Sequence, residues 1–244
     1  MSKLKRRAIS MLALLLIAAA AFLFGWSDVF TVNSISITGV NAAEEKLVAS
    51  RMQNRPEVAK IGIPLARVDK RVVSTRISEL QWIRSVKVSR NWITKEIQIG
   101  VTRRVPIAVI MNSGGRTFLD SELQIFSVPM GGELTSEMSN LPMLTLKNST
   151  PESLSAFDQL RSKIAEIKPS EINAKKLEVR SYLVGNPANS VTLLAIDERT
   201  IKVTWGNSED LAIKIKVFRE LLLLPENVKI VRMDLTAPLS PIVK

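Results

Sequence analysis

The sequence predicts an α+β protein with a single N-terminal transmembrane helix, a small βααββ domain, and a larger, mainly antiparallel β domain with two helices. Three observations carry this prediction. The chain has one membrane-length apolar segment, its later short segments alternate between apolar and polar residues, and capping residues precede its helical stripes.

The composition excludes several classes of active site. The 244 residues include no histidine and no cysteine, which rules out thiol nucleophiles, histidine-based triads, Cys/His zinc sites and disulfides. The formal net charge is +11, and a basic chain is attracted to polyanions such as nucleic acid, anionic lipid or wall polymers. A solvated basic surface near an anionic membrane explains the same charge. We expect no cofactor, no metal site and no small-molecule substrate.

The segment Ala8 to Trp26 is the predicted transmembrane helix. It carries no charged residue, and a helix of this length reaches about 28 Å, close to the thickness of a bilayer's hydrocarbon core. Basic residues within positions 3–7 precede it, so the positive-inside rule keeps residues 1–7 in the cytoplasm as a short tail and exports the rest. A signal peptide cleaved near Ala18 to Ala21 is the alternative. In both cases the bulk of the chain is extracytoplasmic, where nucleic acid is not an expected partner.

Residues 30–104 have the pattern strand, helix, helix, strand, strand. An alternating strand covers Val32–Ile37, and Asn41 with Glu44 then forms a capping box for the first helix. Asp69 caps the second helix. Two helices on one face of a three-stranded sheet would close a small core.

The last two strands of this domain lie in the stretch Leu80 to Ala108. Val86 and Val88 alternate with polar residues in the first arm, and residues 97–101 repeat the alternation in the second. Residues 91–94 form the turn, so the stretch predicts a hairpin with one buried face.

Residues 105–238 form the predicted β domain. Thr150 caps one helix with Pro151 at its first position, and a last helix begins after Ser208 and stops at Pro225. Residues 239–244 are predicted to be a C-terminal tail. Strands are expected over Ile107–Met111, Arg116–Leu119, Ile125–Val128, Met143–Leu146, Lys176–Leu183, Val191–Ile196, Thr200–Trp205 and Val228–Leu235.

Motifs spread over nearly the whole chain are similar to those of the FtsQ/DivIB family of bacterial cell-division proteins. Their order and spacing carry the resemblance, rather than any single motif. At Gln81, Ile93 and Thr102 the chain departs from the family's usual Pro, Pro and Glu. The matching positions are Phe30, Val32, Ile35, Ile37, Gly39, Pro64, Leu65, Val68, Asp69, Leu80, Trp82, Ile83, Val86, Val88, Arg90, Trp92, Ile97, Ile99, Val101, Arg103, Pro106, Ala108, Leu119, Asp120, Ile201 to Gly206, Lys214, Asp234, Leu235 and Pro238.

The resemblance implies a POTRA domain, a docking module, at residues 30–104. It also implies a non-enzymatic, single-pass scaffold of the plasma membrane that is enriched at the division septum. Its implied partners are FtsB/DivIC-like and FtsL-like proteins and other divisome components, and its implied role is control of septal peptidoglycan synthesis.

The last predicted strand is the candidate contact with such a partner. A strand at a sheet edge offers unpaired backbone groups to which a partner segment can add. A covered or internal strand with ordinary charges is the alternative. The candidate residues are Lys229, Val231, Arg232, Met233 and Leu235.

Other side chains have two interpretations each. Trp82 and Trp92 are either binding anchors or packing residues. Arg90, Arg103 and Arg104 either meet an acidic partner or line a solvated strand edge.

Two further functions remain as alternatives. A POTRA-containing docking protein of a secretion or envelope-assembly system would share the small domain. A wall hydrolase would use paired carboxylates such as Asp120 and Glu122, but no apolar pocket around them is readable from the sequence.

Overall fold

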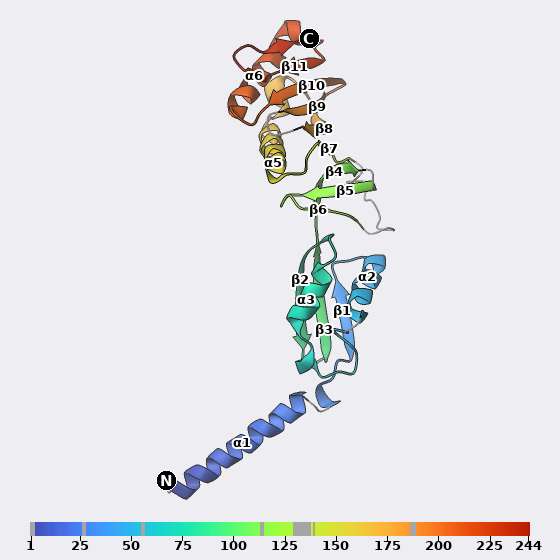
Figure 1. The fold of residues 1–244 in the computed structure, drawn as a ribbon, viewed down its shortest axis with the longest axis vertical. Helices are drawn as coiled ribbons and strands as arrows, with labels where there is room; N and C mark the ends of the chain where they lie inside the picture. The colour runs from blue at the N-terminus through green and yellow to red at the C-terminus, as the bar shows by residue number, and fades with distance from the viewer. Residues whose placement is uncertain are drawn as a thin grey trace. The chain divides into compact units, whose positions relative to one another are not determined.

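The structure is a computed structural model that describes residues 3–25, 28–54, 57–112, 115–128, 138, 140–185 and 189–244. Its contacts divide the chain into two units, Met1–Arg104 with Val128–Gly132, and Val105–Ser127 with Glu133–Lys244. Helices and mixed sheets make it an α+β protein, which confirms the predicted class (Figure 1).

The first unit begins with helix α1 (Lys3–Gly25), and the 3₁₀ helix η1 (Asp28–Phe30) follows. Apolar side chains from Ile9 to Phe24 are exposed on all sides of α1. Within the described residues, no helix meets the combined length and hydropathy needed to cross a membrane. The predicted span therefore stays a prediction, and its last residue, Trp26, lies outside the described residues.

The rest of the first unit has the expected order of strand, two helices and two strands. Strand β1 (Ser34–Thr38) runs parallel to β3 (Glu96–Arg103), and β3 pairs antiparallel with β2 (Ile83–Asn91), which gives the sheet order β1-β3-β2. The helical elements are α2 (Ala42–Gln53), the 3₁₀ helix η2 (Leu65–Arg67) and α3 (Lys70–Ser78).

Local capping fixes the starts of both helices. The Asn41 side chain accepts from the Glu44 N–H at 2.9 Å, and the Glu44 carboxylate accepts from the Asn41 N–H at 3.1 Å, so the predicted capping box is confirmed. The Asp69 carboxylate accepts from the Arg71 N–H at 2.8 Å. Ile97 and Ile99 on β3 are buried with the inward sides of the two helices.

The second unit contains one nine-stranded sheet, in the order β12-β11-β10-β9-β8-β7-β4-β5-β6. The pairs β4–β7, β7–β8 and β10–β11 are parallel and the others are antiparallel, so the sheet is mixed but mainly antiparallel. Its strands are β4 (Pro106–Asn112), β5 (Gly115–Asp120), β6 (Ile125–Phe126), β7 (Met143–Leu146), β8 (Leu177–Val184), β9 (Ser190–Ile196), β10 (Arg199–Gly206), β11 (Arg232–Asp234) and β12 (Ile242–Val243).

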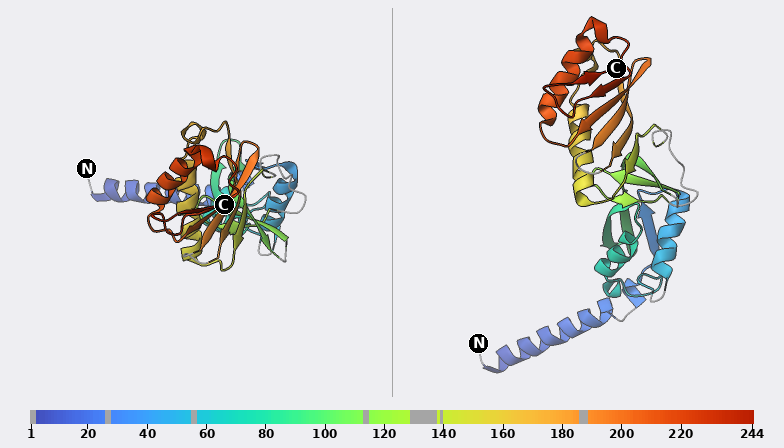
Figure 2. Two further views of the ribbon diagram at one scale, coloured as in Figure 1. Left: turned by 90° about the horizontal axis from the view of Figure 1, so that it is seen from above. Right: turned by 45° about the horizontal axis from the view of Figure 1, so that its top comes forward.

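Helices α5 (Pro151–Ala165) and α6 (Leu211–Leu223) lie against one face of this sheet (Figure 2). Thr150 caps α5 through the Ser153 N–H at 3.3 Å, as predicted. Phe157 and Leu160 of α5 and Phe218 of α6 enter a buried cluster with Trp205 of β10. The short 3₁₀ helices η3 (Pro169–Ile172) and η4 (Pro225–Asn227) follow α5 and α6.

The chain's end differs from the prediction. The expected strand over Val228–Leu235 is reduced to the three residues of β11, because the turn that follows η4 occupies the start of that range at residues 228–229. Residues 239–244, predicted to be a tail, include strand β12, which pairs antiparallel with β11.

Candidate partner-binding edge

The outer strand of the nine-stranded sheet at its C-terminal side is β12. The Lys244 N–H donates to the Arg232 carbonyl at 2.9 Å, and the Arg232 N–H donates to the Lys244 carbonyl at 3.0 Å. Successive residues of a strand direct their backbone groups to opposite sides in the sheet plane. The N–H and carbonyl of Val243 therefore point away from β11.

This arrangement corrects the predicted edge. Strand β11 lies between β10 and β12, so it is internal, and its own backbone is not the open side of the sheet. In the described part of the chain, β12 has β11 as its single neighbouring strand.

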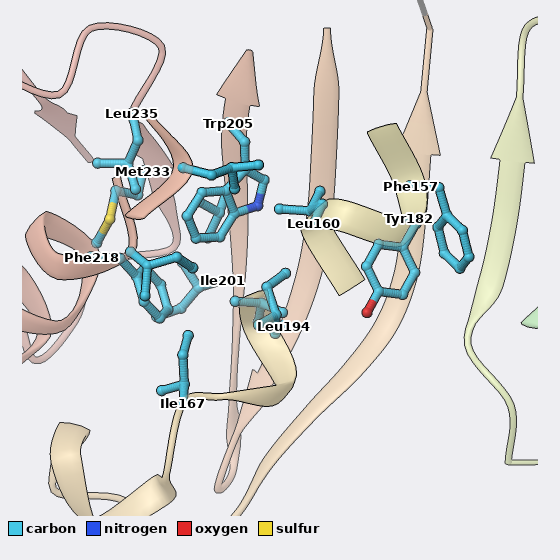
Figure 3. Packing of buried hydrophobic residues seen from close by; sticks show 14 of the residues in the cluster. Phe157, Leu160, Ile167, Tyr182, Leu194, Ile201, Trp205, Phe218, Met233 and Leu235 are labelled. Carbon is cyan, nitrogen blue, oxygen red and sulfur yellow. The ribbon is translucent and has the colours of Figure 1, made fainter. Parts of the chain in front are cut away.

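The five predicted contact residues divide into two groups. Met233 and Leu235 are fully buried, and they pack in the cluster that contains Trp205 and Phe218 (Figure 3). Lys229, Val231 and Arg232 are exposed. The alternation of a strand explains the division of β11, because Met233 points inward while Arg232 points outward.

Exposed apolar side chains surround the edge. Leu239 is 93% exposed, Val231 is 65% exposed and Ile242 is 57% exposed. Single exposed apolar residues are ordinary, but several near one edge strand are typical of a binding surface.

The charge of the edge is positive. Lys202 on β10 lies opposite Arg232 on β11, and Lys229 and Lys244 are exposed near them. The nearby carboxylate of Asp234 accepts from the Thr236 N–H at 2.9 Å. The edge is therefore suited to a partner segment that carries acidic residues.

Lys214 holds the loop before α6. Its buried ammonium donates to the carbonyl and the side-chain oxygen of Asn207 at 3.0 and 2.9 Å. Loss of solvent around this group lowers the pKa of Lys214, while the charges of Asp210 and Glu209 act in the opposite direction. We therefore assign Lys214 a structural role in this loop.

The two tryptophans that the structure describes in the first unit, Trp82 and Trp92, both pack against other residues. Trp82 is 5% exposed and belongs to the core. Trp92 is 37% exposed, and its ring contacts Phe24 and Phe30. The packing interpretation therefore holds for Trp82, whereas Trp92 combines packing with an exposed edge.

The three arginines have partners inside their own unit. Arg90 donates to the Val68 carbonyl at 2.5 Å, and Arg104 donates to the Gln81 carbonyl at 3.1 Å. Arg103 lies 3.1 Å from the buried carboxylate of Glu44. No local pattern indicates this pair, because Glu44 belongs to the first turn of α2, far from Arg103 in the sequence.

Asp120 and Glu122, the candidate hydrolase pair, lie in a turn. The buried Asp120 carboxylate accepts from the N–H groups of Glu122 and Gln124 at 2.9 and 2.8 Å. Glu122 is exposed. Asp120 thus stabilises the turn between β5 and β6, and among the described residues no acidic cluster is suited to hold a metal ion.

No family model matches the chain. The chain is similar to the cell division protein FtsQ of Streptomyces griseus, with 27% identity over 191 residues that cover 75% of this chain and 84% of that protein.

Proposed function

We propose that this chain is a non-enzymatic, membrane-anchored scaffold of the bacterial cell-division machinery. It binds FtsB/DivIC-like and FtsL-like proteins and helps control septal peptidoglycan synthesis. The similarity to a cell division protein FtsQ and the family pattern in the sequence support this role. The structural observation that carries it is the open, cation-flanked edge strand β12.

The proposed contact is strand addition. A partner segment lies beside β12 and pairs with the outward N–H and carbonyl of Val243. Its apolar side chains cover Ile242 and Leu239, and its acidic residues approach Arg232 and Lys244. Addition to β12 leaves the β11–β12 pairing intact, so the buried Met233 is not required to move.

The proposal includes attachment to the plasma membrane through residues 8–26. The uncharged sequence of this segment and its basic N-terminal flank support it. The exposed apolar side chains on every side of α1 also support an apolar surrounding. An exported chain with intact α1 should resist alkaline extraction from membranes, whereas release into the supernatant would contradict the anchor.

Localisation of the full chain tests the cell-division role. A fluorescent protein fused to the N-terminus leaves the β12 edge free, and we expect a band at mid-cell in dividing bacteria. The matched control is the same fusion to residues 1–30 alone, which should label the membrane evenly. An even membrane signal from the full chain would contradict a role at the septum.

Binding of the full chain in lipid nanodiscs tests the scaffold role. The chain is titrated with the extracytoplasmic segment of the FtsB-like protein from the same bacterium. Saturable binding that weakens when the peptide's acidic residues are neutralised is expected. A lack of binding to both FtsB-like and FtsL-like segments would overturn the scaffold assignment.

A further inference from the structure

Three aromatic rings meet where α1 ends. The Phe24 ring stacks on the Phe30 ring with 4.7 Å between centroids, and both contact the Trp92 ring edge-on, at 5.6 and 6.0 Å. Phe24 belongs to the last turn of α1, Phe30 to η1, and Trp92 to the turn between β2 and β3. These ring contacts therefore hold the turn between β2 and β3 beside the C-terminal end of α1.

The tip of this turn exposes an apolar side chain. Ile93, next to Trp92, is 92% exposed. The Asn91 side chain accepts from the N–H groups of Ile93 and Thr94 at 3.0 and 3.1 Å, which fixes the turn with Ile93 directed outward. The exposed Ile93 thus adjoins the partly exposed Trp92, whose ring contacts the partly exposed Phe24 at the end of α1.

Cationic residues cluster at the same end of the unit. The Asn33 N–H donates to the Lys95 carbonyl at 2.8 Å, which places Lys95 beside the segment that follows η1. Arg90, just before the turn, donates to the Val68 carbonyl, so the start of α3 also lies here. Basic residues outnumber acidic ones at this end: Arg67, Lys70, Arg71, Arg90 and Lys95 against Asp28, Asp69 and Glu96.

We propose that the β2–β3 turn inserts Trp92 and Ile93 into the headgroup region of the anionic bilayer that holds α1. This inference rests on the proposed membrane attachment. Tryptophan is favoured at membrane interfaces because its ring is apolar and its N–H is polar. The cations of α3, Lys70 and Arg71, face anionic headgroups, which attract basic segments close to a membrane.

A bilayer is the occupant that the neighbouring features favour. The surface adjoins a helix whose apolar side chains are exposed on all sides, and its flanking charge is positive. A second copy of the chain would bring the same cations together, which disfavours self-association at this surface. The contact would give the first unit a second attachment to the membrane and restrict its rotation about α1.

Depth-dependent quenching in bilayers tests the proposal. The sequence contains no cysteine, so Ile93→Cys in the full chain accepts a single environment-sensitive fluorophore. Gln81→Cys is the matched control, because Gln81 is also exposed and stands at the other end of β2. A nine-residue strand separates the two positions by about 30 Å.

Both variants are reconstituted in vesicles of phosphatidylcholine and phosphatidylglycerol that contain a lipid with a headgroup-proximal spin label. We expect quenching at position 93 to exceed that at position 81 by roughly threefold or more. The excess should fall in vesicles without phosphatidylglycerol, because the cations then lose their anionic partners.

Equal quenching at both positions, in protein that floats with the vesicles, would overturn the lipid contact and leave the membrane anchor standing. Protein that fails to float would overturn both. Shielding of the label at position 93 that grows with protein concentration, without lipid quenching, would assign the surface to self-association instead.

Discussion

Met233 of β11 lies opposite Val243 of β12 in an antiparallel pair. Strand β12 therefore occupies the edge position that the sequence predicts for β11. Met233 faces the core and is fully buried. The partner-binding candidates therefore move outward by one strand, from β11 to β12.

Val243→Pro is expected to weaken binding of an FtsB-like segment by about tenfold or more, since proline removes the outward N–H to which an added strand would bond. The bonds from β12 to β11 use the neighbouring residue Lys244, so this pairing should persist, and the free energy of unfolding should fall only through the lost packing of the half-buried Val243 side chain. Isothermal titration of the full chain measures the affinity.

Val243→Ala is the matched control for that substitution. It shortens the same side chain but keeps the N–H, so its affinity should stay close to that of the unaltered chain. Binding by the proline variant at full affinity would exclude strand addition at β12.

Met233→Ala should lower the free energy of unfolding by about 2–5 kcal/mol, because it leaves a cavity beside Trp205 and Phe218. Val231→Ala, two residues earlier and 65% exposed, should change it by less than about 0.5 kcal/mol. Urea denaturation of both variants measures the difference. Similar losses of unfolding free energy for the two variants would contradict the finding that Met233 is buried and Val231 is exposed.

The elements that could be predicted are those whose signals are local. Asn41 with Glu44, Asp69 and Thr150 each bond to N–H groups within three residues, so the caps are visible in short stretches of sequence. The alternation of Ile97, Ile99 and Val101 likewise predicts which face of β3 is buried.

The parts that could not be predicted depend on contacts far apart in the sequence. Glu44 is buried because Arg103 approaches it at 3.1 Å from β3, whereas the apolar Leu47 in the same helix is 38% exposed. Strand β12 is two residues long, too short for a periodic pattern, and exists because β11 provides its partner. The apolar residues Ile242 and Val243 after Pro241 were its only local signal.

Gly39→Ala is expected to destabilise the first unit strongly. Gly39 has φ of +85°, and a Cβ there would lie 2.0 Å from the Val101 carbonyl oxygen on β3. Backbone strain of about 1 kcal/mol would be added to a clash with main-chain atoms that have no freedom to rotate away. A loss of more than about 2 kcal/mol, or failure to fold, is expected in thermal unfolding.

Gly62→Ala separates the strain from the clash. Gly62 has a similar φ of +90°, but a Cβ added there would meet nothing within 4 Å, so this substitution should cost about 1 kcal/mol. Equal costs at the two positions would show that the close approach of Gly39 to β3 contributes nothing.

Thr192→Val should cost about 1–3 kcal/mol, because the buried Trp205 indole N–H donates to the Thr192 hydroxyl at 2.8 Å and would lose its acceptor. Trp205→Phe removes the donor, so Thr192→Val should cost less in that background. Urea denaturation of the two single variants and the double variant gives the coupling energy. If the costs of the two single variants simply added in the double variant, the hydrogen bond between Trp205 and Thr192 would not contribute to stability.

Tyr182 is the sole tyrosine of the sequence, so its ionisation can be followed alone by absorbance at alkaline pH. Burial raises the pKa of Tyr182 well above its ordinary value, while the nearby charge of Arg161 acts weakly in the opposite direction. In the unfolded chain the phenol has its ordinary pKa of about 10. The fold thus favours the neutral form of Tyr182. The contribution of this form to stability is present below about pH 10 and is lost as the pH rises further.

We expect the phenolate absorbance of Tyr182 to rise together with the loss of near-ultraviolet circular dichroism, because Tyr182 packs edge-on against Phe157 and ionises when the core opens. Ionisation near pH 10 with an intact fold would show that Tyr182 is accessible to water.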